Sequence, residues 1–242
     1  MSYPAGKCSP AVPALPIHPA ERKAIVRTRD NVSTITYVTD FARRERLALA
    51  DLLADLGPDQ PTLCAGWTTG DLAAHLVVRE RRPDAAAGAV ISALAEHSER
   101  VRTAQRAKPY ETTLTALRTP PWWSPVSNPL VDNLTNSGEF FIHHEDVRRA
   151  QPDWEPRDLA AEDATTLWKQ ARFRAKLALG RLDTPIQVRA DGFGEVTIKG
   201  DGTVLSGTPG ELTLFLAGRG QVARVDIVGP AADTVRSARL SL

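Results

Sequence analysis

Glu139 and His143 stand four residues apart in the segment PLVDNLTNSGEFFIHHEDVRRA, residues 129–150. If this segment is a helix, the two side chains lie about 40° apart around the axis and one turn apart along it. A carboxylate and an imidazole at this spacing can bind one divalent metal ion, provided that another element supplies at least one more ligand. The alternative is an ordinary Glu–His pair on a helix surface, where the interaction is weak.

His75 is the candidate for the additional ligand. It lies between two leucines on the inward face expected for the helix TGDLAAHLVVRER, residues 69–81. A single histidine on an apolar face is more often a hydrogen-bonded core residue than a ligand, so His75 alone predicts little. Together, His75, Glu139 and His143 predict a site of two imidazoles and one carboxylate with an open coordination position.

Polar residues near the ligands are expected to support them. Asp132, Asn136 and Asp146 lie close to the ligands along the same predicted helix and can orient them through hydrogen bonds. His144 is about 100° away from His143 around the helix, so we interpret it as a supporting or exposed residue and not as a ligand. Zinc is the expected metal, but two imidazoles and a carboxylate also suit nickel, cobalt or iron.

Composition excludes several classes of protein. The chain has 242 residues, of which 42% are hydrophobic, enough for one large domain or two small ones. A net charge of +1 argues against a nucleic-acid surface built on net charge. No apolar run approaches the roughly 20 residues of a membrane span. The two cysteines, Cys8 and Cys64, have no CxxC spacing, which fits a reducing cytoplasm.

Cys64 has two possible roles. It precedes the helix that carries His75 and can be a reactive thiol near the site. A small, buried, apolar residue is the more common state of a free cysteine, and this is the interpretation that the sequence favours.

The first 37 residues differ from the rest of the chain. They are rich in proline and alanine, and their prolines interrupt any apolar core of a secretory signal. Disorder is therefore the expected state. Since helical periodicity begins at Thr39, we hypothesise that natural translation starts at Val38. Peptides from residues 1–37 in mass spectra of the native protein would contradict this hypothesis.

The middle of the chain is predicted to be almost entirely helical. Apolar residues recur at helical spacing in residues 40–56, 69–81, 129–150 and 158–179, and two further helical pieces are expected within 84–118. Four long antiparallel helices with inward ligands are a known architecture for a metal site. We therefore expect a helical metal-binding bundle.

Two features of this region carry their own expectations. The proline-rich loop 119–129 contains Trp122 and Trp123, which we expect to plug the end of the bundle, with a lid over a pocket as the alternative. His97 stands among charged residues and is expected on a solvated face.

The last 60 residues alternate strands and helices. Strands are predicted at 185–191, 194–200, 203–207 and 223–229, and helices at 211–219 and 230–240. The sequence Gly200-Asp201-Gly202 indicates a hairpin turn after the second strand. This region is too small to be confidently independent, so we expect it to pack on the helices.

Four segments together resemble a known family. They are TDFARRERLALADLL, PTLCAGWTTGDLAAHLVVRERRPDAAAG, EFFIHHEDVRRAQPDW and GTPGELTLFLAGR. They resemble an actinobacterial metal-binding branch of the mycothiol-dependent maleylpyruvate isomerase superfamily, related to DinB/YfiT-like bundles, over nearly all of residues 38–242. The resemblance implies a mainly α fold, with a DinB-like four-helix bundle at 38–181 and a small α+β, sterol-carrier-like module at 182–242.

The resemblance also implies site residues. It places a divalent metal, usually zinc, on His75, Glu139 and His143. Relatives use the thiol mycothiol for isomerisation or S-transfer, and zinc lowers the pKa of such a thiol. Arg219, which closes LFLAGR, is the candidate for binding a substrate carboxylate. An exposed arginine at a helix end is the alternative and the more common arrangement.

The expected function is therefore that of a cytoplasmic, zinc-dependent transferase or isomerase. Its partners would be a small-molecule thiol, mycothiol, and an electrophilic substrate, without nucleic acid or membrane. A metal- or small-molecule-binding protein without catalysis is one alternative, because the sequence names no clear general base. A zinc hydrolase is another.

Overall fold

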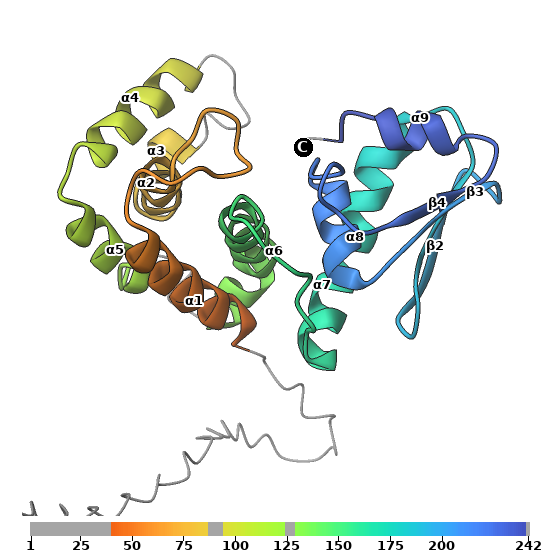
Figure 1. Ribbon diagram of the computed structural model, residues 1–242, viewed down its shortest axis with the longest axis horizontal. Helices are drawn as coiled ribbons and strands as arrows, with labels where there is room; N and C mark the ends of the chain where they lie inside the picture. Colours follow the sequence, from red (N-terminus) through yellow and green to blue (C-terminus); the bar gives the residue numbers. More distant parts are fainter. Residues whose placement is uncertain (1–39, 87–93, 124–128, 241–242) are drawn as a thin grey trace, which may run out of the picture. The chain divides into compact units, whose positions relative to one another are not determined.

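The computed structural model describes residues 40–86, 94–123 and 129–240 (Figure 1). These described residues belong to one compact unit. The predictions made for the first 37 residues lie outside the described part of the chain.

Helices dominate the described residues, as the sequence predicts. They are α1 (Phe41–Leu56), α2 (Thr69–Arg81), α3 (Pro83–Ala86), α4 (Ala95–Arg106), α5 (Tyr110–Arg118), α6 (Pro129–Arg148), α7 (Ala161–Ala178), α8 (Pro209–Leu216) and α9 (Ala232–Ser237). None of the helices in the described ranges is long and apolar enough to cross a membrane. The mainly α class is confirmed, together with a small sheet near the C-terminus.

Helix α2, which carries His75, starts at a well-formed cap. The hydroxyl group of Thr68 accepts a hydrogen bond from the backbone N–H of Asp71, and the carboxylate of Asp71 accepts one from the backbone N–H of Thr68. This capping box satisfies two backbone donors that a helix start otherwise leaves free. The residues around the start of α2 therefore determine where the helix that carries His75 begins.

A shared apolar core holds α2 and α6 in place. Four helices, α1, α2, α5 and α6, contribute buried side chains to it. These are Leu49, Leu53, Leu72, Leu76, Leu114, Leu117, Phe140 and Val147. Because α2 and α6 bury their apolar sides in the same core, the polar residues at the edge of those sides are brought next to each other.

The C-terminal sheet has four short strands in the order β2-β1-β3-β4. They are β1 (Ile186–Ala190), β2 (Gly194–Ile198), β3 (Thr203–Ser206) and β4 (Asp226–Val228). Strand β1 is antiparallel to β2 and parallel to β3, and β3 is antiparallel to β4.

The hairpin predicted at Gly200–Gly202 is wrong. The hairpin joins β1 to β2 instead, through a turn in which Gly192 has a φ of +82°. After β2 the chain passes the start of β1, where the backbone N–H of Thr203 donates to the oxygen of Pro185 at 3.1 Å. A Cβ atom at Gly202 would lie 2.6 Å from that same oxygen. Glycine at 202 thus permits two backbone segments to approach closely. Turns also favour glycine, so the two cases look alike in a sequence.

Helix α7 packs with the sheet. Its residues Trp168, Ala171 and Ala175 share a buried core with strands β1 to β4 and with α8. A smaller cluster connects α7 and α8 to α6 through Phe141 and Leu167. Figure 1 shows α7 and α8 next to each other beside the sheet. Helix α7 therefore connects the sheet with the helix that carries Glu139 and His143.

The two tryptophans of the proline-rich loop do not plug the helices. Trp122 is 89% exposed and Trp123 is 51% exposed, so the expectation of a plug is wrong. Pro120 and Pro121 precede the two tryptophans and end the helical structure before them, and both side chains lie on the surface. His97 is half-buried at the surface, with its Nε2 atom 2.9 Å from Oδ2 of Asp84, in keeping with its expected solvated face.

Glu45 of α1 is a buried carboxylate held by two basic side chains. Its Oε2 atom lies 3.0 Å from Nδ1 of His144, and the guanidinium of Arg157 donates to both carboxylate oxygens at 2.8 and 2.9 Å. Burial raises the pKa of Glu45, but the hydrogen bonds from His144 and Arg157 outweigh this and lower it to about 2. Ionised Glu45 therefore stabilises the folded state.

The stability of the protein is expected to depend on Glu45 in a pH-dependent way. A pKa lowered from 4.5 to about 2 contributes about 3 kcal/mol at neutral pH, and this is lost as the pH falls from 4.5 towards 2. Glu45→Gln should thus lower the free energy of unfolding at pH 7 by about that amount and by much less at pH 3. Urea unfolding at pH 7, 5 and 3 measures this, and an unchanging difference between variant and wild type would contradict it.

Candidate metal centre

Helices α2 and α6 bring the three predicted ligands together. The Nε2 atom of His143 lies 3.3 Å from Oε1 of Glu139, and Nε2 of His75 lies 3.8 Å from the same oxygen. One nitrogen or oxygen atom from each residue lies within 4.8 Å of the other two. The imidazole rings of His75 and His143 meet edge to face with centroids 5.4 Å apart.

These separations suit a small divalent ion. Zinc–nitrogen and zinc–oxygen bonds of about 2.0–2.1 Å in tetrahedral geometry place ligand atoms about 3.3–3.4 Å apart. The distance between Glu139 and His143 already has this value, and the distance from Glu139 to His75 is a few tenths of an ångström longer. Small rotations of the His75 side chain would shorten its distance to Glu139 to the same value.

The charges of His143 and Glu139 are coupled. Burial lowers the pKa of His143, but hydrogen bonds with Asp146, Cys64 and Glu139 outweigh this and hold it well above its usual value. Burial raises the pKa of Glu139, yet the two histidines keep it well below the usual range. A proton on His143 thus supplies the positive charge between two carboxylates, and a metal ion would take its place.

His75 has the opposite electrostatic character. Burial lowers the pKa of His75, and repulsion by His143 and Arg79 adds to this against the attraction of Glu139. Its imidazole is therefore neutral at physiological pH, which is the form that binds metals. The indole ring of Trp67 packs against it at a centroid distance of 5.0 Å and fixes its position from the loop before α2.

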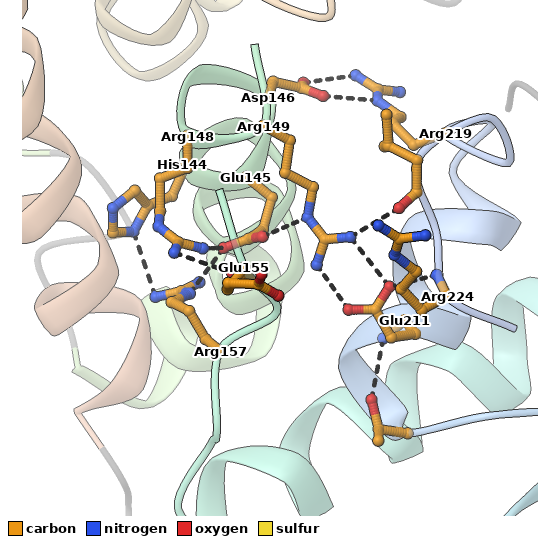
Figure 2. A network of polar contacts seen from close by, with 12 residues as sticks. His144, Glu145, Asp146, Arg148, Arg149, Glu155, Arg157, Glu211, Arg219 and Arg224 are labelled. Carbon is orange, nitrogen blue, oxygen red and sulfur yellow. Dashed lines mark hydrogen bonds and ion pairs between the residues drawn. The ribbon is translucent and has the colours of Figure 1, made fainter. Parts of the chain in front are cut away.

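Asp146 and Arg219 orient the His143 ring. Oδ2 of Asp146 lies 2.9 Å from Nδ1 of His143. The guanidinium of Arg219 donates to both Asp146 oxygens at 2.8 and 2.7 Å (Figure 2). The accepting carboxylate holds the proton of His143 on Nδ1, so Nε2 faces Glu139. Asp146 thus has the supporting position that was expected of it.

Arg219 is not the exposed helix-end residue that is the common arrangement. It follows α8, and its side chain is only 22% exposed because it pairs with Asp146 and donates to the backbone oxygen of Ala217. The carboxylate that it binds belongs to the protein itself. Its predicted contact with a substrate carboxylate stays a prediction.

Arg79 and Asn136 support Glu139, and the sequence analysis did not single out Arg79. Its Nε atom lies 3.3 Å from Oε1 of Glu139, and its Nη1 atom donates to Oδ1 of Asn136 at 2.5 Å. Arg79 follows His75 by four residues on the same face of α2, and this spacing is a signal that could have identified it. Asp132 lies further out, accepting from Asn136 and from the buried Arg46.

A pocket of about 490 Å³ opens beside the two histidines. Its walls include His75, His143, Trp67, Cys64 and Arg219. A volume of this size accommodates a small organic ligand. A molecule in the pocket can therefore contact His75 and His143.

Cys64 is not the buried apolar residue that the sequence favoured. Its half-buried thiol donates to Oδ2 of Asp146 at 3.2 Å and lies 3.9 Å from Nδ1 of His143. Cys64, His143 and Asp146 also form a group with metal-ligating atoms. The guanidinium of Arg219 donates to both oxygens of Asp146 at 2.8 and 2.7 Å. Arg79 approaches Oε1 of Glu139 less closely, at 3.3 Å, so the carboxylate of Glu139 is the less firmly held of the two. The group around Glu139 is the better metal site.

His144 is a supporting residue of a different cluster. It is 7% exposed, so the alternative of an exposed side chain is wrong, and it lies against Glu45 of α1. Its position about 100° from His143 around α6 turns it away from the metal ligands.

Comparison of the chain with protein-family models, with curated proteins and with solved structures finds no match. The fold and the site alone therefore describe the class of protein: it is mainly helical, and it has a candidate centre for a divalent metal between α2 and α6.

Proposed function

We propose that this protein binds one zinc ion through His75, Glu139 and His143, and that it uses the open position to activate a small-molecule thiol. The observation that carries the proposal is the convergence of three ligand atoms within 4.8 Å at the edge of a pocket. The resemblance described above supports a mycothiol-dependent transferase or isomerase with a DinB-like four-helix bundle and a sterol-carrier-like module at 182–242.

Each residue of the centre has a definite task in this proposal. Zinc, when bound, lowers the pKa of a coordinated thiol and keeps it as the nucleophilic thiolate. Asp146 holds the proton of His143 on Nδ1, which leaves Nε2 free to act as a ligand, and Arg219 keeps Asp146 ionised. Trp67 keeps His75 in place and forms part of the pocket wall.

The pocket supports the proposed partners, a small-molecule thiol and an electrophilic substrate. It offers room for a thiol and for an electrophilic group that the thiolate attacks. A cytoplasmic setting suits this chemistry, because low-molecular-weight thiols are kept reduced there.

The test uses the full chain. Elemental mass spectrometry should find about one zinc ion per protein. After exchange of zinc for cobalt, addition of mycothiol or cysteine should produce a thiolate-to-cobalt charge-transfer band. S-methylcysteine, which has no ionisable S–H group, should produce none. Protein that contains no metal would refute the centre.

The alternatives predict other results in the same experiment. Metal without a thiolate band, combined with hydrolysis of a simple ester, would indicate a zinc hydrolase. Metal with neither property would indicate a protein that binds a metal or small molecule without catalysis.

A further inference from the structure

Arg174 of α7 differs from the other arginines near the metal centre. Its side chain is half-buried, yet within the described ranges it takes part in no hydrogen bond and no ion pair. Arg79 and Arg219, by contrast, each hold a carboxylate. A partly desolvated guanidinium without a bound anion is costly, because burial removes hydration and no carboxylate returns the interaction.

The fold places Arg174 next to the centre. Helix α7 lies against α6, with the side chain of Gln170 packed on Gly138, the residue before Glu139. Arg174 follows Gln170 by four residues and so shares its face of α7. Its electrostatic neighbours include Glu139 and Arg219. Burial lowers the pKa of Arg174, and repulsion by Arg219 and Arg79 adds to this against the attraction of Glu139.

The two carboxylates of the centre are already paired. Arg79 pairs with Glu139, and Arg219 pairs with Asp146. Two further carboxylates, Glu80 and Asp132, pair with the buried Arg46 and not with Arg174. A divalent metal would add positive charge at the centre. The arrangement therefore favours an anionic ligand over a neutral one.

We propose that Arg174 forms an anion subsite beside the metal centre, which binds a carboxylate or phosphate group of the molecule that reacts there. The planar guanidinium can donate two parallel hydrogen bonds to either group. The proposal rests on the proposed function for the presence of a reacting molecule, but the subsite itself depends only on Arg174 and its surroundings.

The experiment compares four forms of the full chain: wild type, Arg174→Gln, Arg174→Lys and Arg172→Gln. Arg172 is an exposed arginine on the same helix and serves as the matched control. Propionate and inorganic phosphate are titrated into cobalt-loaded and metal-free protein by calorimetry. Circular dichroism and cobalt affinity report whether each variant keeps its fold and its centre.

The wild type should bind at least one of the two anions saturably, and the tighter one identifies the chemical class. Arg174→Gln should weaken this binding about 10- to 100-fold, as expected for lost hydrogen bonds to a charged group. Arg174→Lys should give an intermediate value, and Arg172→Gln should match the wild type. Cobalt affinity should be the same in all four forms.

Three results would overturn the subsite: no saturable binding of either anion, equal binding by Arg174→Gln and wild type, or an equal loss in Arg172→Gln. Failure of the metal centre gives a different signature. In that case no cobalt binds, while the titrations of metal-free protein still decide whether Arg174 holds an anion.

Discussion

Replacing His143 by alanine is expected to lower the affinity of the protein for zinc by about a hundredfold to a thousandfold. Structural zinc sites bind with about 10–16 kcal/mol shared among four ligands, so one lost ligand costs about 2.5–4 kcal/mol. The change also removes the side chain whose Nε2 atom lies 3.3 Å from Glu139. Competition with a fluorescent chelator measures the affinity, and elemental mass spectrometry measures the metal content of purified protein.

His97→Ala is the matched control for this prediction. His97 is half-buried on α4, contacts Asp84 and belongs to neither group of metal-ligating atoms in the described residues, so its loss should leave zinc affinity unchanged. Thermal unfolding of the metal-free proteins separates lost ligation from lost folding. Full retention of zinc by His143→Ala, or an equal loss in His97→Ala, would show that the three residues are not the site.

The largest expected effect on stability comes from Arg149. This residue is 4% exposed and joins α6 to α8, donating to Glu145 at 2.5 Å and to both oxygens of Glu211 at 2.6 and 3.0 Å (Figure 2). Its guanidinium also stacks on the ring of Trp154. Among the described residues, Arg149→Ala would leave the buried carboxylate of Glu211 with only the backbone N–H of Arg224 as a hydrogen-bond partner.

We expect Arg149→Ala to lower the free energy of unfolding by about 3–5 kcal/mol, because it leaves a buried charge without its counterion. In a chain of this size the melting temperature should fall by about 10 °C. Calorimetry and urea titration measure both quantities. Arg189→Ala removes an exposed arginine paired at 3.6 Å with Glu195 and should change stability by less than about 0.5 kcal/mol. Similar effects of the two substitutions would contradict the role of Arg149.

The sequence was sufficient to predict that Glu139, His143 and His75 lie close together, because their geometry is local. Four residues of helix fix the separation of Glu139 and His143, and the apolar face of α2 fixes the direction of His75. The helices follow from the same periodicity, and caps such as Thr68 mark where they begin. Helical periodicity and helix caps depend on residues that are close in sequence, so they can be recognised without knowledge of the fold.

The supporting contacts could not be derived in this way. Arg219 and Asp146 are 73 residues apart in sequence, and only the packing of α8 against α6 and α7 brings them together. Arg174 could not be identified from the sequence, because what distinguishes it is that it has no ion-pair partner among the described residues. The glycine at 202 was misread because close approach of two backbones and a turn require the same residue.

The contact between Asp146 and Arg219 also restricts how such a protein can evolve. It connects a ligand-bearing helix to the segment that follows α8, so the centre belongs to both parts of the chain. Exchange of the C-terminal part by recombination would leave Asp146 without its arginine and the ring of His143 without its orientation. We therefore expect a substitution at position 146 to require a matching substitution at position 219.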